Sequence, residues 1–327
     1  MAGHGARSGL PGDAVTTAAD RPRLLPAGTP VGDVVVIGEL GSGSSATVYR
    51  ARRPDDGAEV ALKVRALTAE PGGDVVARFS REFELARLVS GPHVVPVLDS
   101  GTVPAWHGRP ALLWLTMELV DGGTGTDLVP PATGEPDLDR VLPALVQVAE
   151  ALDRAHDLDV VHRDVKPANV LLRSGPVVDA VLTDFGTARL LEDLRPVAPR
   201  GRVAGSLPYA APELLTGRLL GPATDVYALA STALEWLTGD PPFPRSTPFA
   251  ITHAHLVDPP PDPTRRRPWL PAAVGDALAR GLAKEPGDRY PRCGELAEAV
   301  RAALTGVQPP APGTRRRHRL LRRASRR

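Results

Sequence analysis

The sequence predicts an α+β protein with a smaller β-rich part that includes one helix, followed by a larger, mainly helical part. Five short runs rich in β-branched residues, separated by Gly and Asp turn signals, lie between residues 34 and 120. Four stretches with apolar residues at helical spacing lie between residues 139 and 304. The Gly-rich segment 121–125 (DGGTG) separates the two patterns. No internal repeat is visible in the sequence.

In the β-rich part, three strands are expected to form a meander, followed by a helix and two more strands. The helix is predicted over 74–89, because its apolar residues share one face and Asp74 is available as N-cap. The strands are expected at 34–40, 46–51, 59–64, 94–101 and 111–120.

In the second part, the Pro-rich segment 258–268 is typical of a loop. The two ends of the chain lack a core-forming pattern. Residues 1–30, rich in Gly, Ala and Pro, are expected to be a disordered leader, and 307–327 a Pro- and Arg-rich tail. The helices are expected at 139–157, 222–237, 271–284 and 293–304.

The net charge of +1 combines a basic tail with an acidic body. Residues 315–327 contain eight arginines and no acidic residue, so the rest of the chain carries a net charge of −7. The single cysteine, Cys293, excludes an intrachain disulfide and favours a reducing compartment. Apolar runs are far shorter than the roughly 20 residues of a membrane span. We therefore expect a cytoplasmic protein.

Lysine and asparagine are scarce. Of the 39 basic residues, 36 are arginine, and the lysines are Lys63, Lys166 and Lys284. The only asparagine is Asn169. This composition is typical of a GC-rich genome, in which a lysine or asparagine that remains is expected to be chemically required. Lys63, Lys166 and Asn169 fall within the motifs below.

The segment 41–48 (GSGSSATV) lies between the first two predicted strands. Its glycines let backbone amides approach a polyphosphate, because no Cβ intervenes. Taken alone, the segment fits a structural hairpin better than a ligand site. It also lacks the terminal Gly-Lys-Ser/Thr of a P-loop.

Lys63 ends the run VALK, where an ammonium group among apolar strand residues must find an anion. It is either a lysine that reaches solvent at a sheet edge or a ligand of the α- and β-phosphates of a nucleotide. In the second case it would also pair with a helix glutamate. Glu82 is the candidate and Glu84 the alternative.

The segment 162–170 (HRDVKPANV) combines Asp164, Lys166 and Asn169 in a loop that a proline interrupts. Phosphoryl transfer needs a carboxylate for the attacking hydroxyl, a cation for the transferred phosphate and a neutral oxygen ligand for Mg²⁺. The loop supplies all three. Twenty residues after Asp164, the segment TDFG places Asp184 after an expected strand, where it would link Mg²⁺ to the phosphates.

In this order, the motifs resemble the eukaryotic-type protein kinases, most closely the bacterial Ser/Thr branch. APE (211–213), DVYALA (225–230) and the arginine of KEPGDRYP (284–291) also match the family pattern. The resemblance covers about 31–306 and implies a bilobal protein kinase fold. The expected divisions are an N-lobe at about 31–118, a hinge at about 118–123 and a C-lobe at about 124–306.

The resemblance implies a Ser/Thr protein kinase that uses ATP and Mg²⁺, with catalytic Asp164, Lys166, Lys63 and Glu82 and metal ligands Asn169 and Asp184. Structural or substrate-positioning roles are implied for Arg163, Ser206, Asp225 and a pair of Glu213 with Arg289. Met117 corresponds to the gatekeeper, and Glu118 and Val120 would offer backbone groups to adenine. The implied ATP-binding residues are Leu40, Gly41, Ser42, Gly43, Ser44, Ser45, Ala46, Val48, Ala61, Lys63, Met117, Glu118 and Val120.

Two departures from the family pattern involve the site. Ala46 replaces a glycine of the phosphate loop, and Ser206 stands where threonine is usual, with a hydroxyl expected to bond Asp164 and Lys166. The stretch between Ala188 and Gly205 contains no Ser, Thr or Tyr. We therefore expect that the enzyme needs no activation-segment phosphate to pair with Arg163.

Other functions remain as alternatives. A catalytically weak pseudokinase or nucleotide-binding scaffold would typically have lost one of Lys63, Asp164, Asn169 or Asp184. A small-molecule phosphotransferase of related fold would generally lack the APE segment. No aromatic residue interrupts the arginines of the tail, so specific nucleic-acid binding is not expected.

The expected partners are ATP and protein substrates with Ser or Thr. The tail 315–327 either is solvated or lies on the anionic inner leaflet of the membrane. The oligomeric state is left open, with a homodimer among the expectations.

Overall fold

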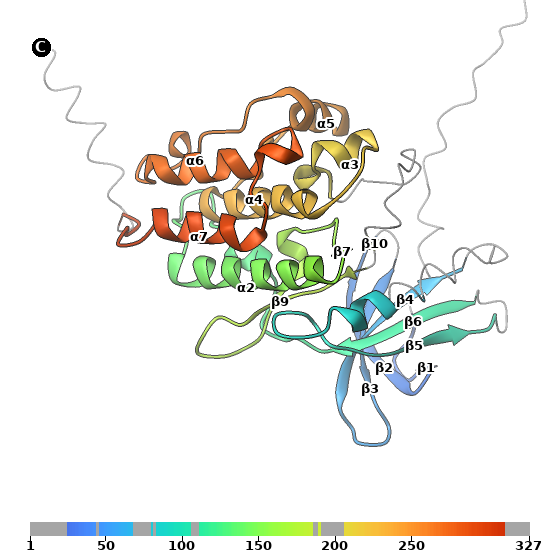
Figure 1. Ribbon diagram of the computed structural model, residues 1–327. Coiled ribbons are helices and arrows are strands. Elements are labelled where there is room, and N and C mark those ends of the chain that lie inside the picture. Colours follow the sequence, from blue (N-terminus) through green and yellow to red (C-terminus); the bar gives the residue numbers. More distant parts are fainter. Residues whose placement is uncertain are drawn as a thin grey trace, which may run out of the picture.

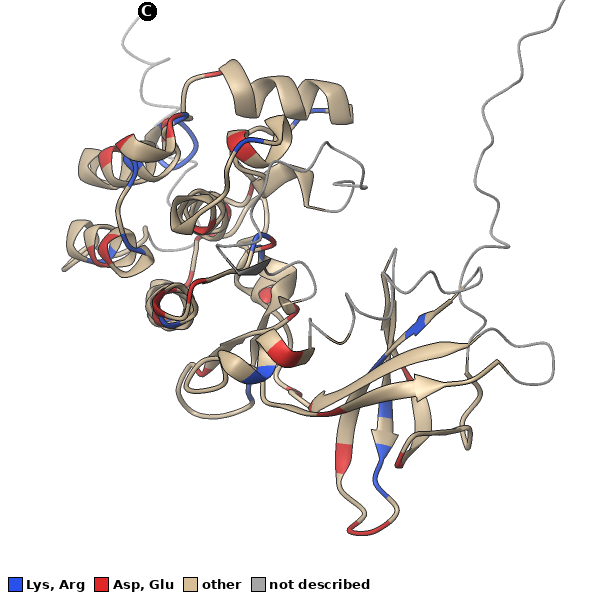
Figure 2. Cartoon of the chain, turned by 45° about the vertical axis from the view of Figure 1, so that its right-hand side comes forward, with Lys and Arg blue, Asp and Glu red and all other residues tan. Residues whose placement is uncertain are grey.

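The computed structural model describes residues 25–310, except 44–45, 68–79, 81–82, 106–110, 186–188 and 191–205. Figure 1 shows a twisted sheet on one side and a group of helices on the other. This arrangement confirms the predicted α+β fold with two lobes. Acidic and basic residues are interspersed over both lobes (Figure 2).

The N-lobe is an antiparallel sheet of six strands in the order β1-β2-β3-β4-β6-β5. Side chains alternate between its faces, so Val60, Leu62 and Val64 of β4 join one apolar cluster with Trp114. Ala61 joins a second cluster on the opposite face, which is therefore the face on which Lys63 lies. The strands are β1 (Pro30–Val31), β2 (Val34–Ser42), β3 (Thr47–Arg52), β4 (Glu59–Ala66), β5 (Val97–Val103) and β6 (Leu112–Glu118).

The described chain begins with a short strap on this sheet. Leu25 is buried in the first cluster, and its amide donates to the Tyr49 hydroxyl at 3.1 Å. Gly28 and Thr29 exchange backbone hydrogen bonds with Val36. The leader expected over 1–30 therefore includes residues that the structure packs against the sheet. Composition alone did not indicate this, because one apolar side chain produces no periodicity.

The C-lobe is built around α4, in which 14 of 17 residues are buried. This helix packs against α2, α6 and α7, and it lies among them in Figure 1. The four predicted helices are confirmed, although the third ends at Gly281 rather than at 284. The helices are α2 (Leu138–Asp157), α3 (Pro212–Thr216), α4 (Pro222–Thr238), α5 (Pro248–Val257), α6 (Ala272–Gly281) and α7 (Cys293–Ala303).

Two of these helices were not predicted, for different reasons. α3 has only five residues, too few to show a period. In α5, exposed Phe249 and Val257 show that apolar residues are not confined to one face. Of the helix expected at 74–89, the structure describes residue 80 and residues 83–89, and 80 and 83–88 are helical. None of the described helices is both long and apolar enough to cross a membrane.

Short strands at the lobe boundary position the motifs HRDVKPAN and TDFG of the sequence. The segment HRDVKPAN lies between β7 (Val160–Val161) and β8 (Val170–Leu172), and Asp184 follows β9 (Ala180–Leu182) by two residues. β8 and β9 form an antiparallel hairpin, and β10 (Arg189–Leu190) pairs with β7. The short 3-10 helices are Gly125–Leu128, Pro167–Asn169, Leu207–Tyr209, Pro263–Arg265 and Pro286–Asp288.

Candidate active site

The loop between β7 and β8 is held from behind by Asp225, a fully buried residue of α4. Its carboxylate accepts the backbone amides of His162 and Arg163, each at 2.8 Å, and His156 Nε2 at 2.8 Å. Burial opposes ionisation of Asp225, but these donors outweigh it and hold its pKa below the usual range. The loop backbone is therefore fixed by a buried anion, as expected for Asp225.

On the front of the loop, Asp164 is oriented by two side chains. Its Oδ2 accepts Lys166 Nζ at 2.7 Å and Asn169 Nδ2 at 3.0 Å, and Asn169 Nδ2 also donates to the Asp164 carbonyl at 2.7 Å. The second carboxylate oxygen, Oδ1, is buried and has no hydrogen-bond partner within the described part of the chain. Because an unpaired buried oxygen is costly, this atom is the natural acceptor for a group that arrives with a substrate.

Ser206 lies beside this group. Lys166 Nζ donates to Ser206 Oγ at 2.9 Å, which places the hydroxyl where the sequence predicted it. The accompanying bond to Asp164 is not found among the described residues. Lys166 therefore connects the carboxylate of the loop to the segment just before α3.

Asp184 is brought to the same place by the β8–β9 hairpin. The Thr183 amide donates to the Asn169 carbonyl at 2.9 Å, and His162 Nε2 donates to the Thr183 carbonyl at 3.0 Å. The His162 ring also packs edge-on against Phe185, with ring centroids 4.7 Å apart. Asp184 adopts a left-handed backbone (φ 71°), a conformation that costs energy for a residue with a side chain and is found at functional sites.

Lys63 crosses from the N-lobe sheet to Asp184, with 2.6 Å between Nζ and Oδ1. Desolvation opposes ionisation of Asp184, but the charge and hydrogen bond of Lys63 more than compensate and lower its pKa. Asp184 remains 40% exposed, so its carboxylate is accessible to a ligand. The structure therefore rejects the reading of Lys63 as a lysine at a sheet edge.

The second apolar cluster of the N-lobe contains several of the residues that the sequence predicts to contact the adenine base. Ala61 and Met117 are buried in it, and Val48, Val120 and Leu171 pack against it. The Glu118 amide donates to the Pro96 carbonyl at 2.9 Å. The backbone group that Glu118 could offer to adenine is therefore its carbonyl. The predicted residues Val48, Ala61, Met117 and Val120 are thus brought together, and Leu171 of the C-lobe joins them.

The predicted phosphate loop, 41–48, covers the end of β2 and the start of β3, and its residues 44–45 lie outside the described part of the chain. A Cβ added to Gly41 would meet no atom within 4 Å, so packing within the described residues does not require glycine there. Open space on this side suits a ligand that approaches the backbone. The Gly43 amide donates to the carbonyl of Ala46 at 2.9 Å, and Leu40 is 48% exposed at the start of the loop. Ser42 Oγ lies 3.2 Å from Thr47 Oγ1.

Comparison with known proteins identifies the family. The sequence profile described as the protein kinase domain matches residues 34–268. The chain belongs to the protein kinase domain family. The resemblance inferred from the motifs is therefore confirmed.

Several mycobacterial proteins are similar to the chain. It is 37% identical to the serine/threonine-protein kinase PknF of Mycobacterium tuberculosis, over 88% of this chain and 59% of PknF. It is 39% identical to the serine/threonine-protein kinase PknJ of the same organism, over 84% of this chain and 46% of PknJ. The chain thus spans about half to three fifths of these relatives. The crystal structure of the M. tuberculosis PknI kinase domain has a TM-score of 0.65 and 33% identity, covering 86% of this chain and all of that domain.

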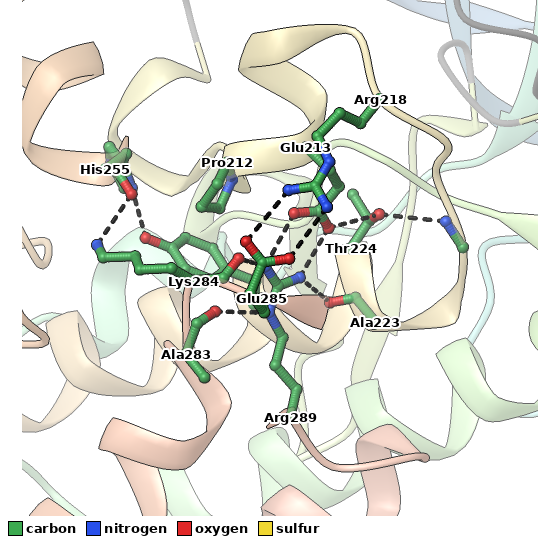
Figure 3. Close-up of polar contacts among 12 residues, drawn as sticks. Pro212, Glu213, Arg218, Ala223, Thr224, His255, Ala283, Lys284, Glu285 and Arg289 are labelled. Carbon is green, nitrogen blue, oxygen red and sulfur yellow. Dashed lines mark hydrogen bonds and ion pairs between the residues drawn. The ribbon is translucent and has the colours of Figure 1, made fainter. Parts of the chain in front are cut away.

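In this kinase domain, the predicted pair of Glu213 and Arg289 is a buried ion pair that joins α3 to the segment just before α7 (Figure 3). Arg289 Nη1 and Nη2 donate to the two carboxylate oxygens at 2.7 and 2.8 Å. Its other three N–H groups donate to the backbone carbonyls of Ala223, Ala283 and Lys284. Thr224 Oγ1 adds a hydrogen bond to Glu213. All five guanidinium donors are therefore used.

Sequence reasoning missed three groups of the kinase site. His156 supports Asp225 from α2, Leu171 packs against the second apolar cluster, and Thr183 Oγ1 contacts Met117 Sδ at 3.8 Å. Leu171 and Thr183 could have been found, since they lie two residues after Asn169 and one before Asp184. Nothing local marks His156, which is 69 residues from the carboxylate that it supports.

Several predicted residues lie outside the described part of the chain, namely Glu82, Ser44, Ser45 and the stretch 191–205. Glu84, the alternative partner of Lys63, is exposed and forms no ion pair with a described residue. The basic tail 315–327 also lies outside.

Proposed function

We propose that this chain is a serine/threonine-protein kinase that transfers the γ-phosphoryl group of ATP to Ser or Thr hydroxyls of proteins, with Mg²⁺. The observation that carries the proposal is the state of Asp164. One of its oxygens is held by Lys166 and Asn169, and the other is buried without a partner among the described residues. A substrate hydroxyl is the group that would complete it.

In the proposed reaction, the substrate hydroxyl oxygen forms a bond to the γ-phosphorus, and the bond from this phosphorus to the β–γ bridging oxygen breaks. The hydroxyl proton passes to Asp164 Oδ1, and ADP leaves. Lys166 lies 2.7 Å from Asp164 Oδ2 and would stabilise negative charge on the transferred phosphoryl group. Lys63, on the other side of the site, would hold the α- and β-phosphates.

The residues present fit a divalent metal. Both hydrogen bonds of Asn169 Nδ2 go to Asp164, so the Asn169 amide oxygen is left for another ligand. Asp184 offers an ionised, partly exposed carboxylate. Hard oxygen ligands of this kind suit Mg²⁺. When bound, the ion would neutralise charge on the phosphates.

Specificity for Ser and Thr is supported by Lys166, two residues after Asp164, and by the names of the relatives PknF and PknJ. A scaffold that only binds nucleotide is not favoured, since Lys63, Asp164, Asn169 and Asp184 are all present and, among them, Lys63–Asp184 and Asp164–Asn169 are in contact.

The test is phosphate transfer to a protein substrate, measured by mass spectrometry with ATP and Mg²⁺. Asp164→Asn and Asp184→Asn are each expected to reduce transfer by roughly 10²–10⁴-fold, with unchanged circular dichroism. Lys63→Met is expected to act likewise. Equal turnover in wild type and Asp184→Asn would contradict the proposal and favour a scaffold.

We also propose that the tail 315–327 attaches the cytoplasmic enzyme to the anionic inner leaflet, since it contains eight arginines and no acid. Each arginine near the surface would contribute about 1 kcal/mol. Vesicle sedimentation is expected to show salt-sensitive binding to anionic lipid. Equal binding to neutral vesicles would contradict this role. Homodimer formation remains a prediction, checked by sedimentation velocity.

A further inference from the structure

The β8–β9 hairpin has catalytic groups at one end and a charged cluster at the other. Asn169 directly precedes β8, and Asp184 follows β9 by two residues. At the opposite end, directly after β8, lies Arg173, whose amide donates to the Asp179 carbonyl at 2.9 Å. Three antiparallel residue pairs join the two ends, so a shift of one end along the hairpin axis is expected to move the other end as well.

Arg173 connects this end of the hairpin to the hinge. Its Nε and Nη2 donate to Glu118 Oε1 and Oε2 at 2.7 and 2.8 Å, and Nη1 donates to Asp179 Oδ2 at 3.1 Å. Hydrogen bonds from Arg173 to Glu118, followed by those to Asp179, raise the pKa of the guanidinium despite partial burial. Only a planar, forked cation can hold a carboxylate at two points while binding a second one, so lysine would not replace it.

The hinge is also docked to β8 through its backbone. The Leu172 amide donates to the Gly123 carbonyl at 3.0 Å, and Thr124 pairs with Leu171 in an isolated bridge. A Cβ on Gly122 would lie 2.4 Å from the Leu172 carbonyl oxygen, so the two backbones are in direct contact. The segment 118–124 is therefore held by a side chain at its start and by backbone at its end, with Val120 between the two anchors.

We propose that Arg173 is a positioning residue for the nucleotide. It fixes the position of the base-binding hinge relative to the metal-binding end of the β8–β9 hairpin. The inference rests on the proposed function. Leu171 and Arg173 are two residues apart, so they extend toward the same side, one to the second apolar cluster and the other to Glu118. A nucleotide that contacts both the hinge and the catalytic end needs these two segments at a fixed position relative to each other.

This role predicts a specific pattern of binding. Partly exposed ion pairs contribute little to folding stability, so loss of Arg173 is not expected to unfold the domain. The affinity of a ligand that contacts the hinge alone should hardly depend on the relative position of the two segments. A ligand that spans the hinge and the catalytic end should lose affinity.

The experiment compares Arg173→Met with a matched control, Arg301→Met. Arg301 uses the same two donors, Nε and Nη2, to hold both oxygens of Glu298 at 2.8 Å, but on the surface of α7. Isothermal titration of the full chain measures the Kd of MgATP and of adenosine for each variant, and thermal unfolding measures Tm.

For Arg173→Met, the Kd of MgATP is expected to rise about three- to tenfold, the scale of one charge pair, with less than about a twofold change for adenosine. Arg301→Met should match wild type for both ligands. Glu118→Gln should act in the same direction as Arg173→Met, and the double variant should bind MgATP no more weakly than Arg173→Met alone, because the two residues form one unit.

Three results would overturn the inference, and they are distinguishable. If wild type binds MgATP and transfers phosphate but Arg173→Met binds like Arg301→Met, the positioning role is wrong and the proposed function stands. An equal loss of affinity for adenosine and MgATP would show that the hinge itself is disturbed, rather than its position relative to the β8–β9 hairpin. If wild type neither binds MgATP nor transfers phosphate, the proposed function fails and this inference fails with it.

Discussion

The front and the back of the catalytic loop use the same kinds of charged side chain in opposite ways. Behind the loop, Asp225 is fully buried, and elsewhere in the C-lobe Arg289 is almost fully buried, with acceptors for all five of its N–H donors. In front, Asp164 has a buried oxygen without a partner among the described residues, and Asp184 is 40% exposed. The back thus holds the backbone, while the front has capacity left for a ligand.

The difference distinguishes supporting charges from reactive ones. A buried charge whose hydrogen-bonding groups are all satisfied has nothing to offer a substrate, and its removal leaves its partners unpaired. A charge that is incompletely paired costs stability, and it persists where function needs it. The two sides are linked, since Asp225 accepts the amide of Arg163, whose left-handed backbone (φ 72°) begins the turn into Asp164.

The largest effect on stability is expected in the interior of the C-lobe. Arg289→Met removes the partner of buried Glu213 and takes one hydrogen-bond donor from each of three backbone carbonyls, so unfolding free energy should fall by about 3–5 kcal/mol. Urea unfolding followed by circular dichroism measures this value. The exposed pair of Arg218 and Glu285 is the control, and Arg218→Met should change stability by less than about 1 kcal/mol. A similar result for both variants would contradict the comparison.

A second effect in the interior of the C-lobe depends on pH. Burial, with a contribution from Lys284, lowers the pKa of His255 to about 4, and its Nδ1 lies 2.8 Å from the Tyr227 hydroxyl. The folded-state pKa is below the usual value of about 6.5, so the unfolded state binds more protons. This contribution to stability is present above pH 6.5 and is lost as pH falls from 6.5 to 4, by up to about 3 kcal/mol.

His255→Asn keeps a polar atom near the position of Nδ1 and removes the titration. Its Tm is therefore expected to decline less than that of wild type between pH 6.5 and 4, measured by differential scanning calorimetry. The groups that face His255 are Tyr227, Phe243 and Lys284, the last through the His255 carbonyl. Parallel pH profiles for the two proteins would show that another group causes the acid sensitivity.

In front of the loop, a much smaller effect on stability is expected. Asp164→Asn retains acceptor and donor atoms for Lys166 and Asn169 while it removes a carboxylate with one unpaired oxygen, so unfolding free energy should stay within about 1 kcal/mol of wild type. The same urea titration measures it. A loss comparable to that of Arg289→Met would show that the front also supports the fold.

The smallest effect is expected for dephosphorylation. The stretch between Ala188 and Gly205 contains no hydroxyl residue, and the hydroxyl of Ser206 is already bonded to Lys166. Phosphatase treatment should therefore change kinase activity by less than about twofold, measured with the same substrate assay. A large loss of activity, traced by mass spectrometry to phosphate on Thr187 or Ser206, would contradict this expectation.

The sequence was most informative where chemistry restricts residue type. Asp164, Lys166, Asn169 and Asp184 lie within about 20 residues, and few residue types can supply the base, the cation and the metal ligands that this chemistry needs. The main strands and helices could also be predicted, because each has a period of its own. The helices α3 and α5 could not, since α3 is too short to show a period and the apolar residues of α5 are not confined to one face.

The sequence by itself thus determined the fold class, the family and the types of residue that carry the chemistry, because these depend on local pattern and on spacing along the chain. Only the tertiary structure decided which charges are satisfied and which are not. Lys63 meets Asp184 from 121 residues away, His156 meets Asp225 from 69, and Arg173 meets Glu118 from 55. Such contacts depend on how separate elements pack, and on burial, which sets the cost of every unpaired group.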